Sequence, residues 1–178
     1  MCGIIGYIGK KEASPILLEG LQKLEYRGYD SSGIGIISSE NGGLIVRKTP
    51  GKIKNLQELI KNDHVPHSHV GIPHTRWATH GAPSRINSHP HADCSKKILV
   101  VHNGIIENYE SLKASLQKKG HQFSSETDTE VIGHLIEEYF DGDIFVAVKK
   151  ALTQLKGSFA LGVICQDCPD RLIAARIG

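Results

Sequence analysis

Short apolar runs alternate with amphipathic segments along this chain, and turn residues between them group the runs into hairpins. Residues 33–38 (GIGIIS) and 44–48 (LIVRK) flank the turn-rich SENGG, which predicts a β-hairpin. Residues 158–165 (SFALGVIC) and 171–176 (RLIAAR) predict a second one. Because antiparallel sheets need helices or another sheet to cover their apolar faces, the pattern predicts a layered α+β domain.

The remaining segments bring the expectation to about six strands and four helices. The opening residues 2–9 are expected to form a buried strand, and Ser14-Pro15 to begin a helix that Gly28 ends. Asp128 stands where the N-cap of a later helix is expected. We expect further strands over 69–76 and 98–104, helices over 53–62, 108–119 and 129–140, and an amphipathic segment over 144–155.

Composition excludes several classes of function. The chain has 178 residues, of which 39% are hydrophobic, and a formal net charge of +2 without blocks of like charge. This composition is that of a globular protein and gives no indication of nucleic-acid or anionic-membrane binding. The N-terminus has no basic region before its short apolar stretch, and no segment reaches a membrane-spanning length. We therefore expect a cytoplasmic protein whose four cysteines are thiols.

Cys2 has two possible roles. A free cysteine is often a small apolar residue of a core strand. Alternatively, removal of Met1 would leave Cys2 with a free α-amine whose pKa is about 8. That amine can serve as the base that activates the neighbouring thiol, as in enzymes with an N-terminal nucleophile.

Four other residues could stabilise an oxyanion or bind charged groups of a substrate. The Asn103 carboxamide and the Gly104 N–H, at the end of an expected strand, are suitable donors for an oxyanion, although Asn-Gly is also a common turn. Arg76 could hold a carboxylate with two hydrogen bonds, or it could be a packing residue. Asp128 could bind an ammonium group, cap its helix, or do both.

Histidines and cysteines offer a competing interpretation. The H-x-H-x-x-C pattern could belong to a soft-metal site, but its spacing matches no common zinc arrangement. Cys165 and Cys168 form a C-x-x-C that enters a turn and has no partner ligands beside it. The potential ligands in and beside the long loop over residues 76–94 are His74, His80, His89, His91 and Cys94.

An ordered set of motifs identifies a family. The chain contains CGIIGYIG, LEYRGYDSSG, HTRWATHG, NSHPH, VVHNGIIENY and SETDTE in this order. The set resembles the N-terminal glutaminase domain of the glutamine-fructose-6-phosphate aminotransferase family, which belongs to the amidotransferases with an N-terminal cysteine. The resemblance covers nearly the whole chain. It implies a four-layer α-β-β-α sandwich of the N-terminal-nucleophile hydrolase type.

The resemblance also implies roles for residues and partners. It assigns L-glutamine as substrate, Cys2 as the nucleophile and no metal or organic cofactor. Asn103 and Gly104 match the oxyanion hole. Arg76 matches the group that holds the α-carboxylate of glutamine, and Asp128 the group that holds its α-amine. The other matching positions are Arg27 and Gly28 beside the nucleophile, Trp77 at the gate to an ammonia channel, Thr79 and His80 on the closing loop, and His89 near the pocket.

In that family the domain continues past the position of Gly178 with further strands and a fused sugar-phosphate isomerase domain, and the protein is a homodimer. We therefore expect residues 1–178 to be a glutaminase domain that lacks its last strands and the isomerase domain. Three hypotheses follow. The chain is the glutaminase part of the aminotransferase, a catalytically silent remnant or binding partner of a separate isomerase subunit, or a metal-binding module.

Overall fold

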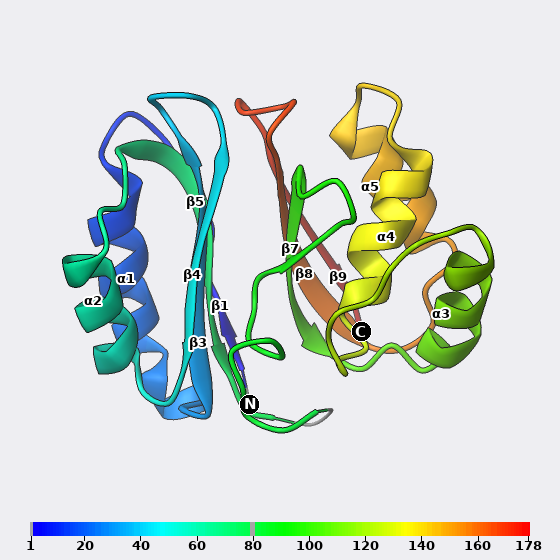
Figure 1. Cartoon of the computed structure of the whole chain (residues 1–178), viewed down its shortest axis with the longest axis horizontal. Coiled ribbons are helices and arrows are strands. Elements are labelled where there is room, and N and C mark those ends of the chain that lie inside the picture. The colour runs from blue at the N-terminus through cyan, green and yellow to red at the C-terminus, as the bar shows by residue number, and fades with distance from the viewer. Residues whose placement is uncertain (1, 79–80) are drawn as a thin grey trace.

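Two antiparallel β-sheets pack face to face, and helices cover the outer face of each. The structure is a computed structural model that describes residues 2–78 and 81–178. Figure 1 shows the four layers in order: α1 and α2, the first sheet, the second sheet, and α3 to α5. The α-β-β-α arrangement expected from the family resemblance is therefore confirmed.

The first sheet comes from the N-terminal part of the chain. Its strands run in the order β1-β5-β3-β4, with β2 also paired to β5. The predicted hairpin is present as β3 and β4, joined in the register Gly35 to Val46. The elements are β1 Gly3–Ile4, β2 Tyr7–Ile8, α1 Ala13–Lys23, a 3-10 turn Glu25–Arg27, β3 Ser31–Ser38, β4 Leu44–Pro50, α2 Ile53–Asn62 and β5 Ser68–Arg76.

The second sheet and its helices come from the C-terminal part. Its strands run in the order β6-β7-β8-β9. The second predicted hairpin is present as β8 and β9, with Gly162 opposite Ala174. The elements are β6 His91–Ala92, β7 Ile98–Gly104, α3 Tyr109–Lys118, α4 Glu130–Tyr139, α5 Ile144–Leu152, β8 Phe159–Cys165 and β9 Leu172–Ile177.

Three apolar clusters hold the four layers together. One lies between α1, α2 and the first sheet, and another between the second sheet and α3 to α5. The third lies between the two sheets and contains Ile72 of β5, Val101 of β7 and Ile164 of β8. Nearly every side chain of β3 and β7 is buried because each of these strands is covered on both faces.

Several details differ from the sequence prediction. The opening segment forms two short strands instead of one, and α1 ends at Lys23, so Gly28 follows the 3-10 turn and does not end the helix. The described residues contain nine strands and five α-helices, more than expected, because the opening segment is divided in two, β6 lies in a sequence interpreted as a loop, and the amphipathic segment 144–155 forms α5. Among the described residues, no helix is long and apolar enough to cross a membrane.

Ile72→Ala should destabilise the fold because its side chain is fully buried between the two sheets. We expect a loss of about 2–5 kcal/mol in the free energy of unfolding, measured by urea denaturation. Ile8→Ala is the matched control, since Ile8 is 46% exposed on β2, and it should change stability by less than about 0.5 kcal/mol. Equal losses in the two variants would contradict the central position of the inter-sheet core.

Candidate active site

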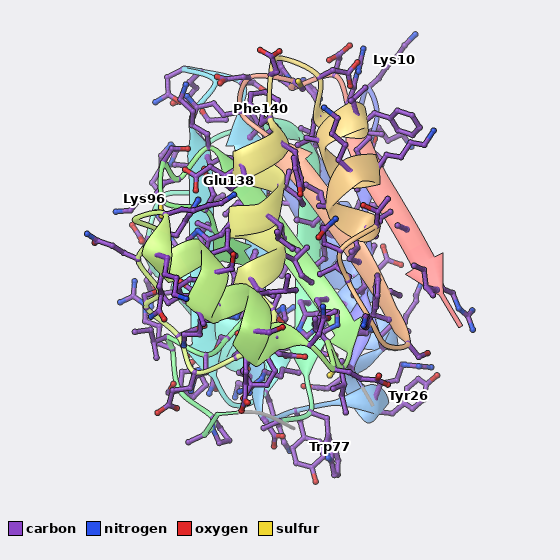
Figure 2. The ribbon with its side chains drawn as sticks, turned by 90° about the vertical axis from the view of Figure 1, so that its right-hand side faces the viewer. Lys10, Tyr26, Trp77, Lys96, Glu138 and Phe140 are labelled. Atoms are coloured by element: carbon purple, nitrogen blue, oxygen red, sulfur yellow. The ribbon has the colours of Figure 1, made fainter. Side chains whose placement is uncertain are left out.

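A cavity of about 610 Å³ opens where the ends of the two sheets meet. Cys2 reaches it from the start of the chain, Arg76 from the end of β5, and Asn103 from the end of β7. Figure 2 shows Trp77 and Tyr26 projecting at this end of the molecule. The predicted site residues that line the cavity are Cys2, Arg27, Arg76, Trp77, His89, Asn103, Gly104 and Asp128.

Backbone and side-chain contacts fix the position of Cys2. The Trp77 N–H donates to Cys2 Sγ over 3.1 Å. Arg27 Nε and Asn103 Nδ2 donate to the Cys2 carbonyl over 3.1 and 3.2 Å. Burial raises the pKa of the Cys2 thiol, while the Trp77 N–H and the Arg76 guanidinium act in the opposite direction. The sulfur is therefore held at the cavity with the pKa of its thiol raised overall, so its attack on a substrate requires a base.

A buried histidine determines how Asn103 is oriented. His74 Nε2 lies 2.8 Å from Asn103 Oδ1 and 3.1 Å from the His102 carbonyl. Both partners are acceptors, so Nε2 carries the proton and donates. The bond to Oδ1 turns the Asn103 NH₂ group toward Cys2, whose carbonyl it contacts. The donor side of the carboxamide is thus presented next to the nucleophile candidate.

Two glycines allow close backbone approach at the site. Gly104 has φ 122°, and a Cβ there would lie 2.3 Å from the Ser158 carbonyl oxygen. A Cβ on Gly28 would lie 2.7–2.9 Å from backbone atoms of Arg76 and Trp77. A side chain at either position would therefore move the segments that hold Asn103 or Cys2.

Arg76 and Asp128 bring opposite charges to the same cavity, and both are almost fully buried. Arg76 donates to the Gly81 carbonyl over 2.9 Å, so it also anchors the loop that follows β5. Burial lowers the pKa of Arg76, and Cys2, Asp30 and Asp128 oppose that change. Asp128 Oδ2 accepts from the Ile106 N–H over 2.8 Å.

The prediction that Asp128 caps the following helix is wrong. The cap position of α4 is occupied by Thr129, and the Asp128 carboxylate points instead to Ile106, just after β7. This contact ties the start of α4 to the end of the strand that carries Asn103 and Gly104. Asp128 is thus held against the cavity by a residue 22 positions earlier in the chain.

Hydrogen bonds hold the long loop after β5 near both of its ends. Near its start, the Ala78 N–H donates to Asp30 Oδ2 over 2.7 Å. Near its end, Asn87 and Glu126 exchange two hydrogen bonds of 2.9 and 3.0 Å. Trp77 is 46% exposed, and its ring meets the edge of Tyr29 at a centroid distance of 5.6 Å. Thr79 and His80, the predicted closing-loop residues, lie outside the described residues.

Beneath the cavity lies a cluster of neutral, buried histidines. His74 and His89 stack with ring centroids 4.0 Å apart, and His91 meets the edge of His89 at 4.8 Å. His89 Nδ1 accepts from the His102 N–H over 3.3 Å. Burial lowers the pKa of His74 to about 3 and those of His89 and His91 well below the usual value. These neutral rings therefore contribute packing and hydrogen bonds beside the cavity, and no charge.

Sequence reasoning missed the supporting residues and grouped Cys94 with other histidines than the structure does. Asp30 orients the long loop and His74 orients Asn103, but no local sequence pattern indicated these two contacts. His74, His89 and His91, candidates for a shared metal site with Cys94, are in ring contact with one another, whereas Cys94 lies beside His121 and His134. The pair Cys165 and Cys168 is buried, and burial raises the pKa of Cys165 to about 11.

Comparison with known proteins identifies relatives of the chain. Residues 74–177 match a family model described as a glutamine amidotransferase domain. The glutamine-fructose-6-phosphate aminotransferase (isomerizing) of Caldanaerobacter subterraneus is 56% identical over 99% of this chain and 28% of that protein. The enzyme of the same name from Thermotoga maritima is 51% identical over 100% of this chain and 29% of that protein. The chain thus spans less than a third of these curated relatives.

Solved structures with similar folds were also found. The glutamine phosphoribosylpyrophosphate amidotransferase of B. subtilis, complexed with ADP and GMP, superposes with a TM-score of 0.79 at 28% identity, covering 97% of this chain and 36% of that chain. A glutamine aminotransferase class-II domain protein from Silicibacter pomeroyi superposes with a TM-score of 0.56 at 15% identity, over 83% of this chain and 73% of that chain. The second likeness concerns the fold alone.

Mild acid should destabilise the protein because its buried histidines are kept neutral in the folded state. Their folded pKa values lie below the unfolded value of about 6.5, so the unfolded chain binds more protons below that pH. The stabilisation is complete above pH about 6.5 and is lost as pH falls toward 3. Between pH 6.5 and 5, urea denaturation should give a slope approaching about 1.4 kcal/mol per pH unit for each such histidine.

The control for this slope is a pair of matched variants. His91→Gln should reduce the slope by up to about 1.4 kcal/mol per pH unit, because one buried histidine is removed. The fold should be kept, since Gln can still bond Thr127 Oγ1, which lies 3.3 Å from His91 Nε2. His64→Gln should leave it unchanged because the His64 side chain is 83% exposed. A stability that does not vary between pH 7 and 5 would contradict the neutral state of the cluster.

Proposed function

The chain belongs to the glutamine amidotransferase family and shares the N-terminal-nucleophile fold of its solved relatives, and on this premise we propose that it hydrolyses L-glutamine through a thioester on Cys2. The observation that carries the proposal is the convergence of Cys2 Sγ, the Asn103 carboxamide and the opposite charges of Arg76 and Asp128 on one cavity. These groups match the amide, carboxylate and ammonium of one substrate.

In the proposed first step, Cys2 Sγ attacks the side-chain amide carbon of glutamine. The thiol proton passes to the α-amine of Cys2, which is free once Met1 is removed, and from there to the leaving nitrogen. The C–N bond breaks and ammonia departs, leaving a glutamyl thioester on Cys2. Asn103 Nδ2 and the Gly104 N–H stabilise the oxyanion, and His74 acts as a positioning residue for Asn103.

In the second step, water attacks the thioester carbon and gives its proton to the same α-amine. The C–S bond breaks, the thiol is restored and glutamate leaves. Arg27 keeps the Cys2 backbone in place throughout, and Gly28 lets the 3-10 turn approach Arg76 and Trp77. The loop that carries Thr79 and His80 is proposed to close over the bound glutamine, which would keep bulk water from the ammonia. Trp77 is proposed to be the gate between the glutamine site and an ammonia channel. His89 lines the pocket and stacks on His74.

Glutamine hydrolysis is further proposed to supply ammonia for glucosamine 6-phosphate synthesis from fructose 6-phosphate. Support comes from the curated relatives, which are named glutamine-fructose-6-phosphate aminotransferases and extend well beyond the length of this chain. On this proposal a sugar-phosphate isomerase domain takes up the ammonia, and the complete protein is a homodimer, as the family resemblance predicts.

Cys2→Ala should abolish glutamate release, with a fall in kcat of about 10³-fold or more, because the proposed nucleophile is removed. Alanine is small, so Met1 removal is preserved and can be checked by intact mass. Cys168→Ser is the matched control, since its Sγ donates to the Gly142 carbonyl, which a hydroxyl can also do, and its activity should match the wild type.

A glutamine-analogue electrophile should label wild-type Cys2 and leave Cys2→Ala unlabelled. If the folded wild-type chain, with Met1 removed, neither reacts nor releases glutamate, the proposed function fails and the silent-remnant hypothesis gains. If a chain that retains Met1 hydrolyses glutamine at the full rate, the role of the α-amine is wrong.

Asp128→Asn should weaken recognition of the substrate ammonium. Asparagine keeps an acceptor for the Ile106 N–H, so the local fold is preserved while the charge is lost. For glutamine we expect kcat/KM to fall about 30- to 1000-fold, the effect of losing one partner of a buried charge pair. For glutaric acid monoamide, which lacks the α-amine, the variant and the wild type should be similar. An equal fall for both substrates would contradict the assignment.

A further inference from the structure

A second cluster of reactive side chains lies away from the proposed glutamine cavity. Cys94 follows β6, His121 follows α3, and His134 and Glu137 stand one turn apart on α4. One potential ligand atom from each residue lies within 4.8 Å of all the others. None of the four lines the glutamine cavity. In Figure 2, Lys96 and Glu138, which neighbour the cluster in sequence, lie well away from Trp77.

Four of the six distances among the potential ligand atoms fit the edges of one tetrahedral metal site, and all six are within 4.8 Å. With Zn–S near 2.3 Å and Zn–N or Zn–O near 2.0–2.2 Å, tetrahedral geometry requires S···N edges of about 3.6 Å and N···O edges of about 3.3–3.5 Å. Cys94 Sγ lies 3.6 Å from His121 Nδ1 and 3.4 Å from His134 Nδ1. Glu137 Oε2 lies 3.2 and 3.5 Å from the same two nitrogens.

A carboxylate lies near the outer nitrogen of each histidine, within hydrogen-bond distance for His121 but not for His134. His121 Nε2 lies 3.0 Å from Glu138 Oε1, and His134 Nε2 lies 3.8 Å from Glu130 Oε1. A carboxylate on the outer nitrogen directs the lone pair of a neutral ring to its inner nitrogen and is the usual support of a metal-bound histidine. The Nδ1 lone pair of His121 therefore points at the small space among the four residues, and His134 Nδ1 faces the same space.

That space is surrounded by potential ligand atoms. A neutral imidazole has one N–H, so the His121 Nε2 that donates to Glu138 leaves His121 Nδ1 as an acceptor. The Nδ1 atoms of His121 and His134 both face Cys94 Sγ and Glu137 Oε2. A divalent metal ion that displaces the thiol proton of Cys94 can bind all four atoms at once.

Backbone N–H groups donate to Cys94 Sγ and to the Glu137 carboxylate and so hold both groups in place. The Gln122 N–H donates to Cys94 Sγ over 3.4 Å. Glu137 accepts the N–H groups of Cys94 and Ser95, each over 3.1 Å. Cys94 is exposed whereas the His134 side chain is 1% exposed, so the cluster has a buried base and an opening through which an ion can enter.

We propose that Cys94, His121, His134 and Glu137 bind one Zn²⁺ ion. Four protein ligands in tetrahedral positions make a closed, structural site, without the open coordination position of a catalytic zinc. The ion would join the turn between β6 and β7, the segment after α3, and α4. It would thereby fix the end of the long loop whose other end, at Arg76 and Trp77, borders the glutamine cavity.

The first test is metal binding to the chelator-treated wild-type chain. It should take up one Zn²⁺ per chain and retain it in dialysis. Cobalt(II), used as a spectroscopic substitute, should give tetrahedral absorption with a thiolate band. The melting temperature should rise by about 5–10 °C when free Zn²⁺ exceeds its Kd about 100-fold.

Variants identify the ligands. Cys94→Ser should abolish the thiolate band and weaken zinc binding at least about 100-fold, and because Cys94 is exposed this variant should still fold. Glu138→Gln, which removes the carboxylate charge beside His121 Nε2 and its exposed ion pair with Lys119, should weaken binding about 10- to 100-fold. The matched histidine control is His64→Asn, which should bind zinc as the wild type does.

Cys2→Ala separates this site from the proposed glutamine site. A free N-terminal cysteine can itself bind zinc through its amine and thiol, so the proposal requires that Cys2→Ala retain full stoichiometry and the thiolate band. Loss of zinc in Cys2→Ala with retention in Cys94→Ser would overturn the proposal. So would a wild-type chain that binds no zinc and shows no change in melting temperature. Neither result bears on glutamine hydrolysis.

Discussion

The packing of the two antiparallel sheets against each other is the constraint on which the rest of the structure depends. Ile72 of β5 and Val101 of β7 meet in the apolar layer between the sheets. Their strands end at the same edge of the sandwich, so Arg76 from the first sheet and Asn103 from the second reach one cavity. The hydrogen bond from Asn103 to the Cys2 carbonyl crosses this junction, and its geometry follows from the sheet packing.

Polar groups buried near that junction make the arrangement specific. His74 lies on β5 and bonds Asn103 at the end of β7, so it fixes the relative position of the two strands as well as the orientation of the carboxamide. Asp128 similarly joins the start of α4 to Ile106. A buried polar group without a partner costs free energy, so alternative sheet registers that break these bonds are disfavoured. The residues proposed to bind and hydrolyse glutamine are thus positioned by hydrogen bonds that also stabilise the fold.

The long loop after β5 links the two proposed sites. Its first residues contact Asp30 and Arg76, and its last residues lead through β6 to Cys94. Bound zinc would restrain this loop at its distal end, while Trp77 at the other end contacts Cys2 Sγ. Ordering both ends reduces the conformations available to the segment between them.

The sequence by itself determined the elements and the main site candidates. Apolar periodicity and turn residues predicted both hairpins and located α2 at its observed bounds, and the ordered motifs identified the residues around the cavity. Only the tertiary structure decided that Asp128 bonds Ile106, that His74 orients Asn103, and that Cys94 lies beside His121 and His134. The physical reason is that periodicity and turn propensity act between neighbours, whereas these contacts join residues far apart in the chain, brought together by the packing of sheets and helices.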